Sequence, residues 1–403
     1  MTTATDAAAL KGRVAGAIAD ARATVVELSH DLHAHPELAM QERHAHDLLA
    51  DTLEQAGFAV TRHAHDVETA FRAEIGTGAG PQVVVCAEYD ALPGIGHACG
   101  HNLIGASSVG AGLSLAGLVD DLGVGLCVLG TPAEEAVGGK AILVERGAFS
   151  RADVALMVHP APLDIREAPA LAVNDLVVTV HGKAAHASLS RSRRANALEG
   201  LVEVYRLLSA HPLGDWERCH GVITHGGDAP NVVPERTEGH WLVRARTDVD
   251  AATLAAMLRD EIETTLADSG CTVEFTSAME VYREMKHNHV LAGAYQANAE
   301  ALGREFVPQA LIGPESASST DMGNVSQVVP SIHPMIGIDS LPALNHQRGF
   351  ADAAVSAAAD TAVHDAAYAI AATVVDLAVD SDLMAAVRAD FERTDSVGDP
   401  LER

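Results

Sequence analysis

The sequence predicts an α/β fold, in which a mostly parallel sheet is sandwiched by helices and interrupted by a smaller α+β domain. Two observations support this prediction. Up to about residue 160, continuous apolar segments such as 83–87 (V-V-V-C-A) alternate with helix-like stretches, which is typical of a parallel sheet buried on both faces. Near residue 172 the pattern changes to segments of alternating polarity, which indicates strands with one face in water.

The first part of the chain supplies most of the expected sheet. Residues 10–57 are expected to be helical, because Val25, Leu28 and Leu32 recur at helical spacing and Gly57 provides a stop. The apolar runs that follow are expected to be buried strands separated by helices, with strands at 83–87, 124–129 and 154–158 and helices at 101–118 and 139–149.

The inserted part has a different expected make-up. Strands of alternating polarity are expected at 176–181 and 238–246, and helices at 195–209 and 251–269. After the insert we expect a helix at 288–302, a strand at 331–338 and a final Ala-rich helix at 351–379, with the last 15 or so residues frayed. The pattern therefore predicts a discontinuous main domain, residues 1–171 and 283–403, around an insert at 172–282.

Composition excludes several classes of protein. The chain has 403 residues, more than one core usually supports, and 48% of them are hydrophobic, which argues against disorder. The formal charge of −28 argues against nucleic-acid and anionic-membrane partners, because phosphate binding needs a basic surface. We see no secretory signal and no apolar run near the roughly 18 residues of a membrane span. Five scattered cysteines without a C-x-x-C pair favour a reduced, cytoplasmic protein.

Metal-ligand residue types follow four of the expected strands. The segment 83–87 is followed by Asp90 and the run H-A-C-G-H, 124–129 by an acidic pair, 154–158 by a histidine, and 331–338 by L-N-H. Ligands bind at the carboxyl ends of parallel strands, and thiolate, imidazole and carboxylate suit zinc or manganese. We therefore predict five metal ligands, which are Cys99, His101, Glu135, His159 and His346.

Five ligands are too many for one tetrahedral ion with an open position, so we expect two divalent ions, zinc or manganese, that share a ligand. Asp90 is expected to orient a ligand imidazole. Of the adjacent acids we assign Glu134 as the general base, because Glu135 should point the other way off the loop. Each residue alone also has a structural explanation: a lone His159 can be a satisfied core residue, and an E-E pair often complements a helix dipole.

Histidine is unusually abundant, with 21 residues. The densest group lies near the N-terminus and lies outside the strand-end pattern, so we do not expect it to bind metal; its members are His30, His33, His35, His44 and His46.

Several motifs together resemble a known family. They are L-H-A-H-P-E-L, D-A-L-P-G-I-G-H-A-C-G-H-N, T-P-A-E-E, H-G-K-A-A-H-A-S, N-V-V-P and L-N-H, in the family's order across about residues 28–352. The chain is similar to the dimetal amidohydrolases grouped with aminoacylases and carboxypeptidase G-type enzymes. G-I-G-H-A-C-G-H-N-L-I and S-S-T-D-M-G-N-V-S-Q-V-V-P-S-I-H-P most resemble the aminobenzoyl-glutamate hydrolase and β-alanyl-lysine dipeptidase group.

The resemblance implies a zinc-peptidase-like catalytic domain and a lid domain through which two chains form a homodimer. On this basis His186 would reach the partner subunit's site and steady the oxyanion, and Asn231 and Arg244 would contact substrate. Two departures leave the substrate open: the ending L-N-H-Q-R-G-F, and three arginines in the lid that could receive a carboxylate, which are Arg191, Arg193 and Arg194.

The expected activity is hydrolysis of an amide bond in a small N-acyl amino acid or dipeptide, by metal-activated water with Glu134 as base. Hydrolysis of a carbamoyl or other non-peptide amide is the alternative reaction. A metal-binding homologue without catalysis is the alternative of another class, and the retention of both Glu134 and His186 argues against it. A zinc nucleobase deaminase is disfavoured because its H-x-E plus C-x-x-C signature is missing.

Overall fold

The computed structural model describes residues 4–76, 80–188 and 195–393. Arg191, Arg193 and Arg194 therefore lie outside the described residues. The chain divides into two compact units: unit 1 is Met1–Pro169, Met285–Ser316 and Asn324–Arg403, and unit 2 is Ala170–Glu284 and Ala317–Gly323. Each is described by itself.

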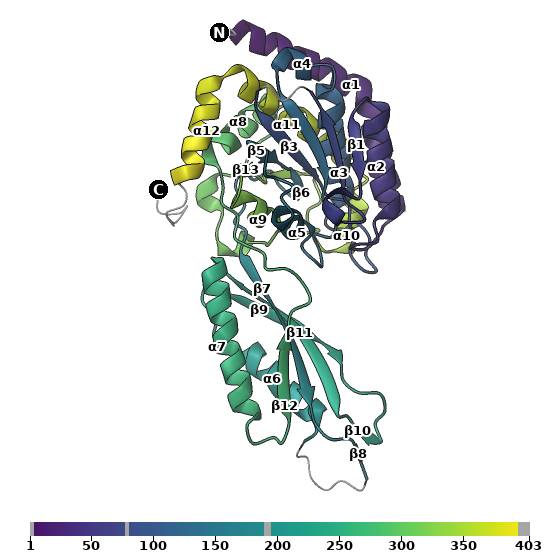
Figure 1. Cartoon of the computed structure of the whole chain (residues 1–403), viewed down its shortest axis with the longest axis vertical. Helices are drawn as coiled ribbons and strands as arrows, with labels where there is room; N and C mark the ends of the chain where they lie inside the picture. The colour runs from purple at the N-terminus through teal and green to yellow at the C-terminus, as the bar shows by residue number, and fades with distance from the viewer. Residues whose placement is uncertain (1–3, 77–79, 189–194, 394–403) are drawn as a thin grey trace. The chain divides into compact units, whose positions relative to one another are not determined.

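Unit 1 contains a six-stranded mixed sheet (Figure 1). Its strands in spatial order are β1 (Ala59–Arg62), β2 (Phe71–Ile75), β4 (Gly125–Gly130), β3 (Gln82–Ala87), β5 (Val154–Leu156) and β13 (Ser331–Ile332). The last four are parallel, as the apolar runs predict, whereas β1 and β2 are antiparallel additions at one edge. Two further parallel strands, β6 (His159–Ala161) and β14 (Met335–Gly337), pair with each other.

The helix α3 (His101–Leu115) lies at the centre of unit 1 and contacts α1 (Ala4–Ala34), α2 (Arg43–Gln55), α11 (Ala357–Val379) and the strands β3 and β4. Nearly every residue of α3 is buried. Its small residues make this possible, since a Cβ on Gly110 would lie 3.0 Å from both Ala367 Cβ and Val25 Cγ2. The remaining helices of unit 1 include α4 (Val119–Leu122), α5 (Gly139–Glu145), α8 (His289–Glu300), α10 (Arg348–Ala353) and α12 (Ser381–Arg393), and α9 (Met322–Ser326) spans the boundary between the units.

Three expected elements are divided in the structure. The expected helix at 10–57 breaks at 35–42, where Pro36 restricts the preceding residue and α2 starts anew. The expected strand at 331–338 is interrupted at Pro334, which has no N–H to donate. The expected helix at 351–379 begins again at Ser356, whose side chain accepts a hydrogen bond from Ala359 N.

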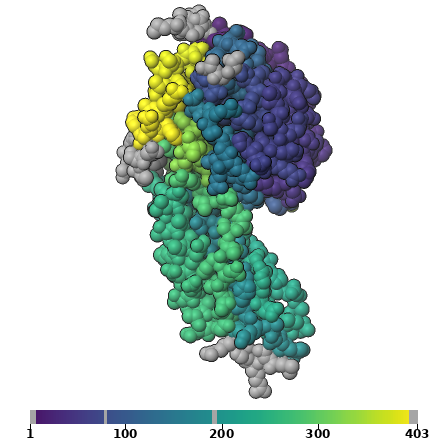
Figure 2. Space-filling view, viewed as in Figure 1, coloured from purple at the N-terminus to yellow at the C-terminus, as the bar shows by residue number. Residues whose placement is uncertain are grey.

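The C-terminal expectation was wrong in part. Residues 381–393 form α12, which packs against α8 and buries Met384 and Val387. Figure 2 shows α12 in yellow at the surface of unit 1. The helix was missed because its sequence is highly charged and only a narrow apolar stripe faces inward.

The helix α11 is long and apolar enough to cross a membrane by length and composition, contrary to the expectation that no such run exists. Of its most apolar window, 67% is buried inside the protein. Its residues belong to the core of unit 1, which accounts for the apolar composition without a membrane.

Unit 2 is a four-stranded antiparallel sheet with helices α6 (Ala197–Ala210) and α7 (Asp248–Leu266) packed on it. The strand order is β12 (Thr272–Thr276), β7 (Ala172–His181), β11 (Arg236–Ala245) and β9 (Arg218–His225). The strand β11 alternates in burial as expected, whereas β7 is buried along most of its length, which the alternating polarity of its sequence did not predict. A separate pair joins β8 (Ala185–His186) to β10 (Val232–Val233).

Candidate metal centre

The strand ends of unit 1 bring the five residues that we expected to bind metal close together. Three groups of potential ligands each have their donor atoms within 4.8 Å of one another, and these groups are Cys99 with His101 and His159, Cys99 with Glu135 and His346, and His101 with Glu134 and Glu135. Cys99, His101 and Glu135 each belong to two of these groups, so they connect the three.

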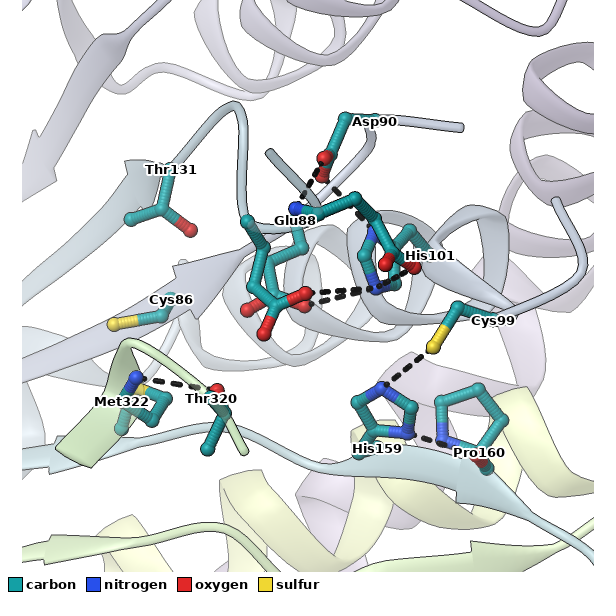
Figure 3. A network of polar contacts seen from close by, with 12 residues as sticks. Cys86, Glu88, Asp90, Cys99, His101, Thr131, His159, Pro160, Thr320 and Met322 are labelled. Atoms are coloured by element: carbon teal, nitrogen blue, oxygen red, sulfur yellow. Dashed lines mark hydrogen bonds and ion pairs between the residues drawn. The ribbon is translucent and has the colours of Figure 1, made fainter. Parts of the chain in front are cut away.

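In the C-G-H segment, Cys99 and His101 lie on either side of a glycine that no other residue can replace without strain. Gly100 has φ +82°, and a Cβ there would lie 2.4 Å from Pro160 Cγ. Only glycine takes this conformation without strain. In Figure 3 the Cys99 thiol points toward His159, with Sγ 3.5 Å from Nε2, while the His101 ring lies beside Glu88 and Asp90.

The two acids of the E-E pair both face His101. Glu134 Oε2 lies 4.0 Å and Glu135 Oε1 3.8 Å from His101 Nε2. Glu135 also extends to His346, with Oε2 3.5 Å from Nε2. We expected the two side chains to diverge; instead they share one neighbour, and only Glu135 spans two of the ligand groups.

Asp90 is completely buried and contacts two parts of the site. Its Oδ1 accepts a hydrogen bond from His101 Nδ1 at 2.9 Å, and its Oδ2 accepts one from the backbone N of Glu135 at 2.9 Å. Burial would raise the pKa of Asp90, but the His101 charge and hydrogen bond outweigh it and lower the pKa. This geometry is the one expected of a carboxylate that orients a ligand imidazole.

The charges of the cluster shift one another's pKa values strongly. Burial would raise the pKa of Cys99, yet the neighbouring His159 and the hydrogen bonds from imidazoles hold it well below the usual value. Burial and the Cys99 charge raise the pKa of Glu135 to about 7, and hydrogen bonds to Cys99 and Glu135 raise that of His346 to about 10. Buried anions are thus held by protons on imidazoles, a role that divalent cations can take over.

The donor set fits divalent metal. Among the described residues, His101 Nε2 and Glu135 Oε1 are buried without a hydrogen-bond partner, although they face each other. Buried polar atoms are normally paired, so two such atoms directed at one another indicate that a further group belongs between them. Thiolate, imidazole and carboxylate together favour zinc or a similar ion.

The three residues expected to contact substrate or the oxyanion all lie in unit 2. His186 is exposed on β8, with Nδ1 2.9 Å from Ser188 Oγ. Asn231 is exposed beside β10, and its carbonyl accepts a hydrogen bond from Ala187 N. Arg244 lies near the end of β11 and donates from Nε to Ser319 Oγ at 3.1 Å.

Three buried residues at this centre were not assigned a role from the sequence. Glu88 Oε1 forms an ion pair with Lys140 Nζ at 2.5 Å, and both side chains are fully buried. Glu88 Oε2 lies 3.4 Å from His101 Nε2, and the His333 ring lies 5.3 Å from that of His159. Glu88, like Asp90, follows the end of β3, so its place in the sequence could have indicated a role at this centre. Lys140 could not be assigned from the sequence, because the acidic pair at 134–135 does not indicate that the lysine after it is buried beside Glu88.

The chain is similar in sequence to known peptidases and amide hydrolases. Residues 174–269 match a family model described as a peptidase dimerisation domain. The chain is 38% identical over 401 residues to the Xaa-Arg dipeptidase of Mus musculus, covering 95% of this chain and 92% of the relative. It is 33% identical over 254 residues to one of the p-aminobenzoyl-glutamate hydrolase subunits of Escherichia coli strain K12, covering 57% of this chain and 52% of the relative.

Solved structures show the same fold. A dinuclear metal-binding peptidase of the M20 family from Bacillus subtilis superimposes with a TM-score of 0.66 at 20% identity, covering 89% of this chain and 98% of that one. An aminobenzoyl-glutamate utilization protein from Klebsiella pneumoniae gives a TM-score of 0.69 at 15% identity, covering 89% and 97%. The resemblance noted in the sequence is confirmed, and the chain belongs to the M20 family of metal-dependent peptidases.

Proposed function

We propose that the protein hydrolyses the amide bond of a dipeptide or small N-acyl amino acid at a centre of two divalent ions, zinc or manganese. The convergence of five ligand side chains at one end of the sheet is the observation that carries this proposal; the five are Cys99, His101, Glu135, His159 and His346. When bound, such ions polarise the scissile carbonyl and lower the pKa of water.

The residues of the chain supply the proton transfers. Glu134, beside His101, takes a proton from the attacking water and returns it to the leaving amine. Asp90 keeps His101 in one orientation by accepting from Nδ1. Glu134 is therefore the base, and Glu135, which extends to His346, is the ligand.

Unit 2 would supply the remaining groups. We assign His186 to the oxyanion and Asn231 and Arg244 to the substrate. The match of residues 174–269 to a peptidase dimerisation domain supports a homodimer formed through this unit. The five cysteines, all within the described residues, are free thiols. We therefore propose that the protein acts in the reducing cytoplasm.

The substrate is proposed from the relative that covers most of the chain. The 38% identity to an Xaa-Arg dipeptidase spans 95% of the chain, whereas similarity to the aminobenzoyl-glutamate hydrolase subunit spans 57%. A dipeptide with a C-terminal basic residue is therefore our first choice of substrate.

A substrate panel tests the proposal. The panel contains Xaa-Arg and Xaa-Lys dipeptides, aminobenzoyl-glutamate, N-acetyl amino acids and an N-carbamoyl amino acid, each assayed with zinc and with manganese. We expect basic dipeptides to be cleaved fastest and EDTA to abolish the reaction, with recovery on adding metal. If only the carbamoyl compound were cleaved, the proposed dipeptide substrate would be wrong. Turnover that survives complete removal of metal would refute the mechanism.

The base is tested separately. Glu134→Gln keeps the size of the side chain but cannot accept the proton, so kcat should fall by at least about 100-fold while both ions stay bound. Full activity of this variant would refute the assignment of Glu134.

A further inference from the structure

A second group of metal-ligand residues lies on the N-terminal helices, away from the strand ends. Asp31 and His35 are one turn apart near the end of α1, and His44 lies in the first turn of α2. His44 Nε2 is 2.5 Å and His35 Nδ1 3.3 Å from the same oxygen, Asp31 Oδ1. The two imidazole rings are 4.7 Å apart, and the three donor atoms lie within 4.8 Å of one another.

The neighbouring histidines have other contacts. His30 Nε2 lies 2.8 Å from Asp360 Oδ1, His33 Nε2 donates to the carbonyl of Ala351 at 2.9 Å, and the His46 ring stacks on His63 at 5.4 Å. Only part of the N-terminal histidine cluster therefore shares one carboxylate.

The backbone around these three residues is already fixed. Glu37 accepts hydrogen bonds from the backbone N of His44 and of Ala45, each at 3.0 Å, and so holds the start of α2. The Glu37 carbonyl in turn accepts from Ala91 N at 2.8 Å. Because Asp31 lies in the last turn of α1, His35 directly follows that helix and this turn fixes His44, an ion would need little more than side-chain rotation.

The spacing is close to that of a tetrahedral metal site. Bonds of about 2.0–2.1 Å at tetrahedral angles place two ligand atoms roughly 3.3 Å apart. The His35 and Asp31 atoms already have that separation, at 3.3 Å, and His44 has to withdraw from its 2.5 Å hydrogen bond by less than about 1 Å.

We propose that Asp31, His35 and His44 form a third divalent-metal site, of two imidazoles and one carboxylate, that joins α1 to α2. This donor set suits zinc or another borderline ion such as cobalt or nickel. The side chains are 40%, 58% and 42% exposed, respectively, which lets the ion enter and leaves a coordination position for water. None of the three belongs to the strand-end groups, so this site and the proposed catalytic centre are independent.

Ion counting tests the proposal. Chelator-treated full-length protein is dialysed against cobalt or zinc and the bound ions are counted. We expect three ions per chain in the wild type and two in His44→Asn, His35→Asn and the isosteric Asp31→Asn, with affinity for the third ion reduced at least about 10-fold. The matched control is His30→Asn, which removes an exposed histidine of α1 that pairs with Asp360. This variant should still bind three ions per chain.

Two further measurements separate this site from the catalytic centre. In a Cys99→Ala, Glu135→Gln background one ion should remain, and its cobalt spectrum should lack a thiolate charge-transfer band. Three ions in the wild type together with three in His44→Asn would overturn the proposal, as would two in both proteins. One ion in the wild type and none in His44→Asn would uphold the helical site and refute the dinuclear centre. Thermal unfolding of the metal-free variants, which replace exposed side chains, should match the wild type.

Discussion

Glu42 holds the loop that carries Glu134 and Glu135. It is fully buried at the start of α2, and its Oε1 accepts a hydrogen bond from the backbone N of Ala133 at 2.8 Å. Ala133 has φ +64°, a left-handed conformation that costs an alanine about 1–2 kcal/mol. The Ala133 carbonyl accepts from Val137 N and Gly138 N, so this one residue fixes both sides of the loop.

Loss of this hydrogen bond should therefore affect turnover. Glu42→Ala leaves the Ala133 N–H unpaired, and we expect kcat to fall about 10–100-fold with KM changed little, since a positioning partner of this kind contributes on that scale. Glu42→Gln keeps an acceptor oxygen and should recover most of the activity. Equal losses in both variants would mean that the carboxylate charge, not the hydrogen bond, is what matters.

Elements with a strong apolar pattern could be predicted from the sequence, and elements at the edges could not. The parallel strands β3, β4 and β5 are recognisable because they are buried along their length. The strand β1 was missed because half of its residues are exposed. The helix α12 was missed because it is highly charged, and one of its charged residues, Asp390, is buried and accepts a hydrogen bond from His289 N at the start of α8. Elements at the edges are stabilised mainly by tertiary contacts, and the local pattern of apolar and polar residues does not reveal such contacts.

The close contacts of α3 give a prediction about stability. Gly110→Val should destabilise unit 1 by about 1–3 kcal/mol, because the side chain meets Ala367 and Val25 at 3.0 Å in a packed core. The control is Gly117→Ala just after the helix, where a Cβ meets none of the described atoms within 4 Å and stability should hold. Denaturant unfolding followed by far-UV circular dichroism measures the free energy of unfolding of both variants. An unchanged free energy in Gly110→Val would contradict the prediction and show that the neighbouring side chains move to accommodate valine.

In unit 2 the strands β7 and β11 are joined by a pair between the buried Asp175 and the partly exposed His240, and this pair has a defined pH dependence. Asp175 accepts hydrogen bonds from His240 Nε2 and from Met279 N at 3.2 Å. Burial would raise the pKa of Asp175, but these bonds outweigh it and lower the pKa, while the Asp175 bond raises the pKa of His240. The histidine contribution is thus complete below pH 6.5, its ordinary pKa, and is lost as pH rises through the raised value.

The free energy of unfolding of unit 2 should therefore fall as pH increases from 6 to 9. His240→Asn should abolish this dependence, and Asp175→Asn should cost about 1–3 kcal/mol at pH 6, because the buried Asp175 loses its charge and one of its two acceptor oxygens. Both tryptophans, Trp216 and Trp241, lie in unit 2, so their fluorescence reports this unit. His181→Asn, which removes a surface pair with Glu274 in the same sheet, is the control and should keep the wild-type slope; a wild type with no slope would contradict the pair's role.

At the scale of the whole molecule, the order of strands determines where the chemistry lies. Residues from 90 to 346 meet because the carboxyl ends of parallel strands share one edge, and this could be predicted without coordinates. The positions of Glu42 and Lys140 could not be predicted, because residues at the start of a helix carry no signal of which strand end they reach. The N-terminal histidines were not expected to bind metal because they lie outside the strand-end pattern, and the sequence does not show that the turn between α1 and α2 brings Asp31, His35 and His44 together.

Anomalous diffraction from crystals grown with zinc or manganese tests the central claim most directly. We predict two strong peaks in unit 1 within bonding distance of the strand-end residues, which are Cys99, His101, Glu135, His159 and His346, with Glu134 outside the coordination shell of both ions. Peaks that are absent from this cluster, or that are bound by Glu134 in place of Glu135, would contradict the assignment of the catalytic centre.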